Sequence, residues 1–267
     1  MADWQGLVAT DRGVIAMTGA DAREVLQGVI TNDIERLAPG APLYAALLTP
    51  QGKYLFDFIL VDAGDGRILF DIARNQGQDL AKRLMMYCLR RDAKVEGTGA
   101  TAVGLAWGEG EPPEVPAHLV VPDPREPALG CRIYGPDPVA GLTKGSREAY
   151  DALRVEHAVP EAGAELLPNE TFILEAGFER LGGVDFRKGC YVGQEVTARM
   201  KHKTELRKGL AKVEIEGYAE PGTEIIANGK KVGTLYTTSG TRGLAHLRFD
   251  RAGPNMEAGT AKVSYSP

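Results

Sequence analysis

The chain has few cysteines, no long apolar run and none of the common cofactor-binding motifs. Its three cysteines are odd in number, far apart and free of any CxxC pair, which excludes a disulfide framework. No apolar run approaches the ~20 residues that cross a bilayer, and residues 1–6 lack the basic and apolar regions of a secretory signal. HExxH, P-loop, nucleophile-elbow and close zinc-ligand patterns are also missing. These absences predict a cytoplasmic protein that does not contact membranes.

The composition is that of an ordinary globular protein. The chain has 267 residues, 43% of them hydrophobic and 25% charged, which is enough to bury a core and to form two or three compact units. The net charge of -5 argues against a surface that is generally coated by a polyanion, although a local basic patch stays possible.

The pattern of apolar residues predicts an α+β chain. An apolar face and a Ser146 cap favour helices over residues 77–90 and 146–157, and Asp21 has the spacing of a capping box. A proline-rich stretch at 112–127 reads as a connector. Short strands are predicted over 7–9, 14–17, 43–49, 54–61 and 67–72, the last three as a meander, and over 209–216, 223–227, 231–238, 243–249 and 260–265 as a small barrel.

One run, DFRKGCYVGQE at 185–195, places a thiol beside two cations and between two glycines. Positive charge such as that of Lys188 stabilises a thiolate, so Cys190 is a candidate nucleophile or ligand. Gly189 and Gly193 can adopt backbone angles closed to other residues, which allows a tight turn around the thiol. A lone cysteine is also commonly a small buried hydrophobe, so the residues alone leave both readings open.

Two polar residues, Gln194 and Glu195, follow the second glycine at the predicted start of a short helix over 194–202. Free amides at a helix start favour an anion, here at Cys190. Three roles stay open for Glu195: it can cap those amides, orient Lys188 or transfer protons. Gln194 carries the same ambiguity.

The segment Lys188-Gly189-Cys190-Tyr191-x-Gly193-Gln194-Glu195, with LGGVDF before it, resembles the signature of the YgfZ-type folate-binding proteins. Those proteins are relatives of the glycine-cleavage T-protein, an aminomethyltransferase, and are implicated in iron-sulfur cluster maturation. Further similar stretches extend from about residue 7 to 267 and include LQGxxTND at 26–33, YAALLTPQGK at 44–53, DPR at 123–125, LRVE at 153–156 and RMKHK at 199–203.

The resemblance implies an α+β, multi-domain fold of GcvT/YgfZ type, with antiparallel sheets and helices around a central folate cavity and a small C-terminal β-barrel. It implies two interleaved subdomains, residues 1–45 with 130–203 and residues 46–129, followed by a barrel over 204–267. It also implies tetrahydrofolate or a related folate as ligand and no permanently bound metal. The folate contacts expected from it are Asn32, Asp57, Arg125, Glu156 and Lys201.

The function implied by the resemblance is that of a folate-binding accessory factor for [4Fe-4S] enzymes, with an indirect effect on tRNA modification. Its expected partners are folate and iron-sulfur assembly proteins or client enzymes. Cys190 is then the reactive thiol or ligand, with Lys188 and Glu195 beside it. Because a cluster normally takes four thiolates, a chain with one candidate thiol makes at most a transient or shared cluster contact.

Two other functions stay open. The first is a tetrahydrofolate-dependent aminomethyltransferase, but the T-protein has paired aspartates where this chain has Phe56-Asp57, and its GYTGE segment has no clear equivalent, so the classical transfer is doubtful. Asp57 itself can be a plain solvent-facing strand residue. The second is RNA binding by the basic run at 199–208, which is otherwise a charged surface or a site for the folate glutamate tail.

Overall fold

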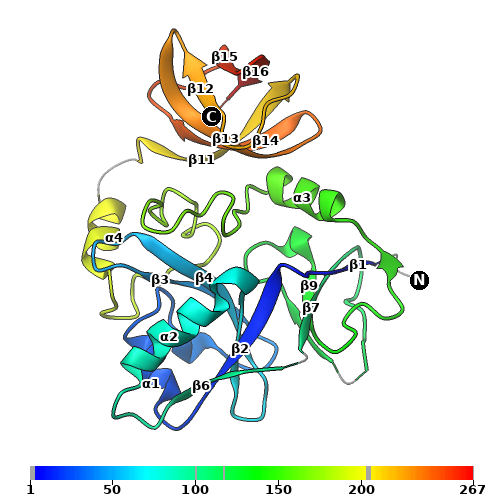
Figure 1. Cartoon of the computed structure of the whole chain (residues 1–267), viewed down its shortest axis with the longest axis vertical. Helices are drawn as coiled ribbons and strands as arrows, with labels where there is room; N and C mark the ends of the chain where they lie inside the picture. The colour runs from blue at the N-terminus through cyan, green and yellow to red at the C-terminus, as the bar shows by residue number, and fades with distance from the viewer. Residues whose placement is uncertain (1–3, 100, 117, 203–205, 267) are drawn as a thin grey trace.

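The first sheet of the molecule is antiparallel and forms the lower part of Figure 1. The structure, a computed structural model, describes residues 4–99, 101–116, 118–202 and 206–266. The meander predicted over residues 43–72 is confirmed, because its three strands pair in sequence order, and two further strands extend it at one edge. The order of the strands is β3 (Leu43–Leu48), β4 (Tyr54–Asp62), β5 (Ile68–Ala73), β2 (Arg12–Thr18) and β6 (Lys94–Gly97).

The second sheet combines the start of the chain with residues 102–144. One pair of its strands, at an edge, is parallel and the other pairs are antiparallel. The predicted strands at 7–9 and 14–17 thus belong to different sheets, and the proline-rich stretch contains a strand as well as a connector. The order is β10 (Thr143–Lys144), β1 (Gln5–Val8), β7 (Ala102–Trp107), β9 (Cys131–Gly135) and β8 (Leu119–Pro122).

The two sheets share a core because side chains alternate along each strand. On β4, Ile59 and Val61 point into a cluster that also contains Val103 and Leu105 of the second sheet. The intervening side chains, such as Phe58, point to the opposite face, where helices cover them. The two sheets therefore pack face to face around one shared core, and helices cover the outer face of the first sheet.

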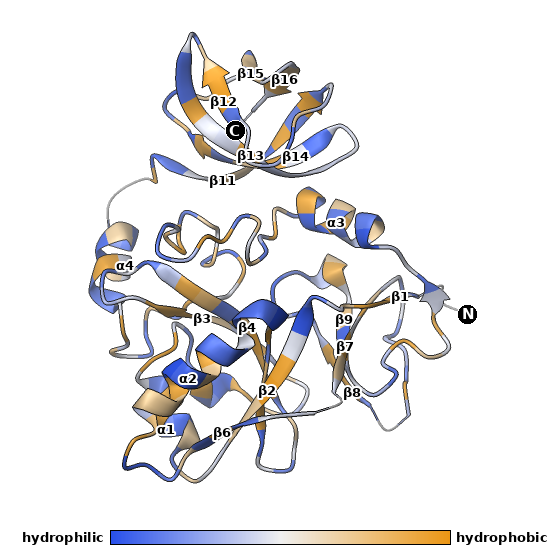
Figure 2. Ribbon diagram, in the orientation of Figure 1, coloured by the Kyte–Doolittle hydropathy of each residue, from blue (hydrophilic) through white to orange (hydrophobic). Residues whose placement is uncertain are grey.

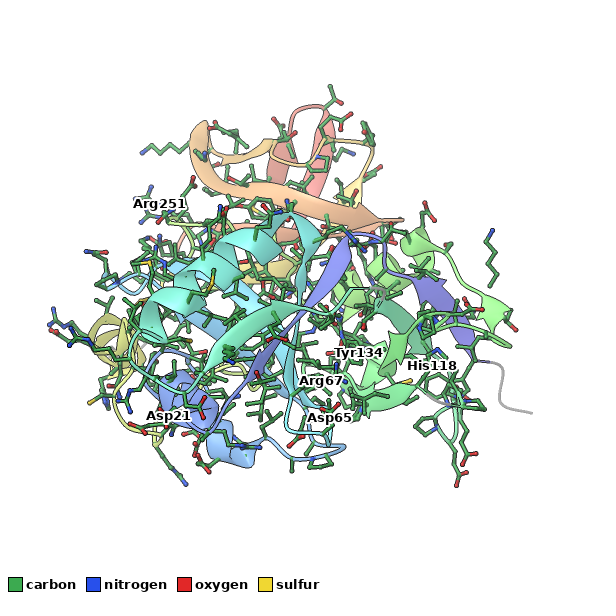
Figure 3. The ribbon with its side chains drawn as sticks, turned by 60° about the horizontal axis from the view of Figure 1, so that its bottom comes forward. Asp21, Asp65, Arg67, His118, Tyr134 and Arg251 are labelled. Carbon is green, nitrogen blue, oxygen red and sulfur yellow. The ribbon has the colours of Figure 1, made fainter. Side chains whose placement is uncertain are left out.

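Four α-helices are described: α1 (Ala22–Gln27), α2 (Gly77–Tyr87), α3 (Arg147–Glu156) and α4 (Gln194–His202). Both α1 and α2 pack on the outer face of the first sheet. Ser146 caps α3 as predicted, because its Oγ accepts a hydrogen bond from the Ala149 amide at 3.1 Å. The predicted capping box of α1 is wrong: the Asp21 carboxylate (Figure 3) instead accepts from the Asp92 amide at 2.8 Å.

The barrel predicted at the C-terminal end is confirmed and is closed. Side chains along its first strand alternate between buried and exposed, as the changing colours of the barrel strands in Figure 2 illustrate. None of the helices in the described ranges is long and apolar enough to cross a membrane. The barrel strands, in order, are β11 (Lys208–Glu216), β14 (Arg242–Arg248), β13 (Lys230–Ser239), β12 (Glu224–Ala227), β15 (Met256–Ala258) and β16 (Ala261–Ser264).

The sheets divide the chain differently from the predicted subdomains 1–45 with 130–203 and 46–129. Residues 12–97 supply the whole first sheet, whereas residues 102–144 join the first strand in the second sheet. The predicted division at residue 45 falls inside β3, because strand pairing and not local composition decides which segments share a sheet. The boundary between residues 203 and 204 lies outside the described residues.

Candidate functional site

The candidate thiol lies on an exposed turn just before α4. Cys190 is the exposed member of the three cysteines, whereas Cys88 is half-buried and Cys131 is buried. Gly189 and Gly193 have φ angles of +94° and +85°, values that side-chain-bearing residues rarely adopt. The two glycines thus give the turn its shape, and the thiol reaches solvent between them.

Lys188 anchors this turn to the end of α1. Its Nζ donates hydrogen bonds to the carbonyl oxygens of Gln27 at 2.6 Å and Ile30 at 2.7 Å, and Gln27 Nε2 donates back to the Lys188 carbonyl at 3.2 Å. Burial lowers the pKa of Lys188 to about 8, although Asp33 and Asp185 act in the opposite direction. The hydrogen bonds of the ammonium group hold the turn in place, and thiolate stabilisation by Lys188 stays a prediction.

Gly193 joins the turn to the loop between β3 and β4. A Cβ atom at Gly193 would lie 2.7 Å from the Thr49 carbonyl oxygen and 3.2 Å from the Gly52 Cα. A Cβ atom at Gly52 would in turn meet Val196 of α4 at 2.8 Å. The backbones around Gly52 and Gly193, which are roughly 140 residues apart in sequence, therefore pack directly against each other. Only glycines allow so close an approach.

Tyr191 is the buried member of the motif. It is 7% exposed, and the Lys188 ammonium lies 5.0 Å from the centre of its ring. Its hydroxyl is buried without a hydrogen-bond partner in the described ranges, and burial raises its pKa. Tyr191 therefore fixes the turn by apolar packing and by contact with the Lys188 cation.

Of the two polar residues at the start of α4, Glu195 is exposed and Gln194 is half-buried. The Glu195 side chain is 83% exposed and pairs with Arg199 one helical turn later at 2.7 Å. It does not orient Lys188, whose ammonium bonds to backbone carbonyl oxygens instead. The backbone N–H of Gln194 donates to the Tyr191 carbonyl oxygen at 3.1 Å and closes the turn. The proton-transfer role for Glu195 stays a prediction.

The side chain of Asn32, an expected folate contact, forms hydrogen bonds to the backbone of three segments of the protein. It is 1% exposed, and its Nδ2 donates to the carbonyl oxygens of Tyr44 at 2.8 Å and Gly182 at 2.7 Å. Its Oδ1 accepts from the Asp33 amide at 2.8 Å. Thr31 adds a hydrogen bond to the Gly183 carbonyl at 2.6 Å. The LQGxxTND stretch thus binds the LGG segment that leads into the Cys190 turn.

Asp57 is 2% exposed, so the solvent-facing alternative is wrong. Its Oδ1 accepts a hydrogen bond from the Tyr54 hydroxyl at 2.8 Å, and its Oδ2 accepts from the Tyr44 hydroxyl at 3.2 Å. Burial and the nearby Asp57 carboxylate raise the pKa of both tyrosines, so they stay protonated as donors.

Arg125 belongs to a buried network of ion pairs between the sheets. It donates to both carboxylate oxygens of Asp123, at 2.9 and 2.8 Å. Arg132 bridges Asp123 at 3.0 Å and Asp71 at 2.5 Å, and Arg12 donates to Asp71 at 2.7 Å. Burial alone would raise the pKa of both carboxyls, but the arginines lower it. Arg12, Asp71 and Arg132 were not predicted from the sequence as members of a site.

The two remaining folate contacts lie at the surface and have partners. Glu156 pairs with Lys212 at 2.9 Å and also with Arg242, and so connects α3 to the barrel. Lys201 pairs with Glu179. Of the five expected contacts, Asn32, Asp57 and Arg125 are engaged in buried hydrogen bonds and all three lie against Tyr44, whereas Glu156 and Lys201 lie apart from them at the surface. Their role as folate contacts stays a prediction.

The basic run at 199–208 does not form one patch in the described part of the chain. Arg199, Lys201 and Lys208 each pair with a different carboxylate, those of Glu195, Glu179 and Glu175. Residues 203–205, which include one of its lysines, lie outside the described residues. In the described ranges no three His, Cys, Asp or Glu side chains gather as a metal site.

The fold matches that of a solved aminomethyltransferase. The crystal structure of glycine cleavage system aminomethyltransferase T from Bartonella henselae aligns with 99% of this chain and 86% of its own, at a TM-score of 0.80 and 15% identity. The chain has the fold of that enzyme. A family model described as "CAF17, C-terminal beta-barrel domain" also matches residues 207–267.

Curated proteins similar to the chain include iron-sulfur cluster assembly factors. The mitochondrial assembly factor IBA57 homologs of Chaetomium globosum, Neurospora crassa and Pyricularia oryzae are 33%, 31% and 34% identical over 83%, 74% and 74% of this chain. The chain spans 59%, 51% and 54% of these relatives' own lengths.

The expectation of a cytoplasmic protein is corrected by these relatives, whose names place them in mitochondria. The expectation rested on the missing secretory signal at residues 1–6. Other targeting signals differ from a secretory signal in composition, being amphipathic and rich in arginine and serine. The missing secretory pattern therefore could not establish a location.

Proposed function

We propose that this protein is an accessory factor in the assembly of iron-sulfur proteins, and that Cys190 is its point of contact with a cluster, a sulfur species or a client protein. The observation that carries the proposal is the exposed thiol on a turn fixed by Lys188 and Gly193. The similarity of the chain to iron-sulfur cluster assembly factors supplies the process.

The chemistry of the other cysteines supports a shared site. Burial raises the pKa of Cys131 to about 11, and burial also raises the pKa of the half-buried Cys88. Neither is a ready thiolate ligand. Since a cubane cluster normally takes four thiolates, Cys190 can supply one ligand and a partner protein must supply the others. Assembly proteins and client enzymes are partners of that kind.

A YgfZ-type role with tetrahydrofolate belongs to the same proposal, and the shared fold supports it. Asn32, Asp57 and Arg125 are bonded internally, so a folate that contacts them has to share or displace these hydrogen bonds. Titration of the full chain with tetrahydrofolate tests this part: saturable quenching of tryptophan fluorescence is expected. Failure to bind would remove folate from the proposal and leave the thiol role standing.

The alternative functions have less support. Aminomethyl transfer needs a carboxylate placed for the reacting amine, but both oxygens of Asp57 accept tyrosine hydroxyls. RNA binding by the run at 199–208 loses support because three of its described cations, Arg199, Lys201 and Lys208, pair with three different carboxylates.

The experiment is complementation in cells that lack this protein. The activity of a [4Fe-4S] enzyme such as aconitase is measured with wild type, Cys190→Ser and, as a matched control, Cys88→Ser. We expect wild type and the Cys88 variant to restore activity and the Cys190 variant to fail, at equal protein levels. Restoration by Cys190→Ser would reject the thiol role, and normal aconitase activity in cells without the protein would reject the assembly function.

A further inference from the structure

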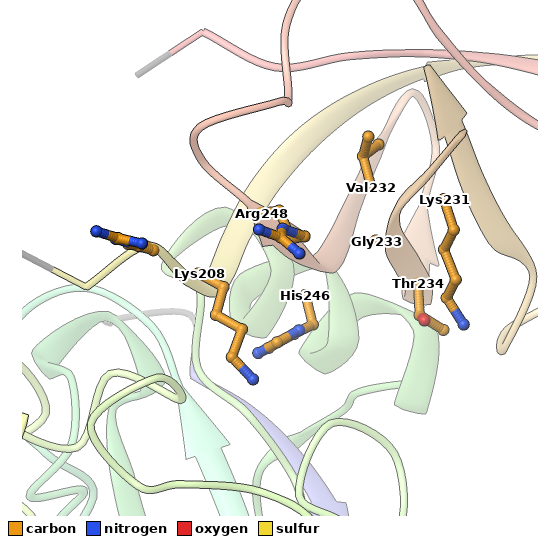
Figure 4. A pocket seen from close by; sticks show the side chains of 8 residues that line it. Lys208, Lys231, Val232, Gly233, Thr234, His246 and Arg248 are labelled. Carbon is orange, nitrogen blue, oxygen red and sulfur yellow. The ribbon is translucent and has the colours of Figure 1, made fainter. Parts of the chain in front are cut away.

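A basic hollow of about 520 Å³ opens on the barrel where β11, β13 and β14 lie side by side (Figure 4). This volume lies within the range of small-molecule sites, about 300–1,000 Å³. The hollow is independent of the Cys190 turn, which contributes none of its lining. The polar side chains around it are those of Arg207, Lys208, Lys231, Thr234, His246 and Arg248.

Four full positive charges line this hollow, and the carboxylates that pair with three of them, Glu175, Glu224 and Asp250, are not among its lining residues. That local excess contrasts with the net charge of -5 on the whole chain. The strand register also brings two of these charges together, because Lys208 and Arg248 are directly opposite each other on antiparallel strands. Like charges in that arrangement destabilise a sheet, and an anion bound between them would remove the repulsion.

The cations have partners that can give way to a ligand. Lys231 pairs with Glu224 at 2.8 Å and Arg248 with Asp250 at 3.4 Å, and all four side chains are well exposed. Exposed ion pairs of this kind are weak. The Arg207 side chain has no ion pair in the described ranges. These three groups are therefore available to an incoming anion.

One buried carboxylate, that of Glu175, holds two of the lining side chains in place. Glu175, whose side chain is 9% exposed, accepts from Lys208 at 3.4 Å and lies 3.3 Å from His246 Nε2. Lys208 and His246 point the same way from neighbouring strands in Figure 4. Thr234 is opposite His246 across the β13–β14 pair, so its hydroxyl adds a neutral donor beside the cations.

We propose that this hollow binds a small ligand that carries adjacent phosphate groups, such as pyrophosphate or the phosphate chain of a nucleotide. Guanidinium groups form paired hydrogen bonds with phosphate oxygens, and lysine adds point charge. Four cations match two or three linked phosphates better than one. The lining has no Phe, Tyr or Trp on which a base could stack, so the phosphates and not the base are recognised.

Isothermal titration of the full chain with pyrophosphate and, separately, with ATP tests the proposal. Arg248→Gln is expected to weaken both affinities about tenfold or more, because it removes a charge-assisted hydrogen-bonding group. Lys262→Gln is the matched control, since it removes a barrel cation that pairs with Glu216 outside the hollow. It should leave both affinities unchanged. Tighter binding of ATP than of tripolyphosphate, which has the same number of phosphates, would identify the nucleotide as the source of the phosphates, and equal binding would identify the phosphates alone.

Four results would overturn the proposal. Absence of binding at millimolar pyrophosphate and ATP would show that the hollow is an ordinary solvated surface. Equal weakening by Lys262→Gln, or equal affinity for citrate, would show only general attraction of anions. Binding of tRNA with no binding of pyrophosphate or ATP would assign the hollow to a nucleic-acid backbone. Thermal unfolding of both variants checks that each is folded before titration.

Discussion

Two glycines beside Cys190 offer a matched test of how the turn is built. Both have positive φ angles, +94° at Gly189 and +85° at Gly193, and an alanine in that region costs about 1–2 kcal/mol. They differ in their surroundings. A Cβ atom at Gly189 meets nothing within 4 Å, whereas one at Gly193 lies 2.7 Å from the Thr49 carbonyl oxygen and 3.0 Å from the Leu48 Cβ.

Gly189→Ala should therefore lower the free energy of unfolding only by the cost of its backbone conformation, about 1–2 kcal/mol. Gly193→Ala should cost that and about 1–3 kcal/mol more from overpacking, because the nearest atom is a backbone carbonyl oxygen that cannot rotate away. For a chain of this size, 1 kcal/mol corresponds to about 2–4 °C in Tm. Urea denaturation and thermal unfolding of the two variants measure the difference. Equal losses would refute the claim that the β3–β4 loop braces the turn.

Further predictions concern the buried ion pairs and Lys188. Asp71→Asn removes the carboxylate that pairs with buried Arg12 and one of the two that pair with Arg132, and should cost about 3–5 kcal/mol in urea denaturation. Asp65→Asn breaks an exposed pair and should cost less than about 1 kcal/mol. The pKa values of Asp71 and Asp123 are lowered on folding. Their full contribution to the free energy of unfolding should therefore be present above the ordinary carboxyl pKa near 4 and should be lost as the pH falls below it. An unchanged urea midpoint down to about pH 3 would contradict this. The pKa of Lys188 falls from 10.5 to about 8 on folding, so the unfolded state binds more protons between these values. The unfolding free energy of wild type relative to Lys188→Met should then rise as pH increases through 8, and a constant difference between about pH 7 and about pH 9.5 would refute it.

The Cys190 turn could be predicted from sequence because its information is local. Two glycines four residues apart, a cysteine between them and a helix start after them specify the turn without knowledge of any distant segment. The same holds for the barrel, whose strands are short, consecutive and separated by turns such as Asn228-Gly229. Local sequence did not show what braces the turn, because Gln27 and Thr49 are remote in the chain.

The buried network could not be assembled from sequence for the same reason. Asp71 and Arg132 come from different sheets, and only strand pairing brings them together. One signal was available: a single aspartate inside the apolar strand ILFDIA must be buried or must interrupt the core. The internal hydrogen bonds of the expected folate contacts could not be predicted either, because a motif identifies residue types but not whether their hydrogen bonds are directed inward. Asn32 and Arg125 satisfy buried partners, which a ligand would have to displace.

The two glycines also define the side from which a partner can reach Cys190. On the Gly193 side the turn is packed against the β3–β4 loop and α4, so no further backbone fits there. On the Gly189 side the space within 4 Å of a Cβ position is open. A partner that shares a cluster through Cys190 must bring its own ligands within bonding distance of the sulfur, and a residue without a side chain beside the thiol permits that approach. Gly193 thus serves the packing of the turn, and under the proposed function the open space at Gly189 would give a partner access to the thiol.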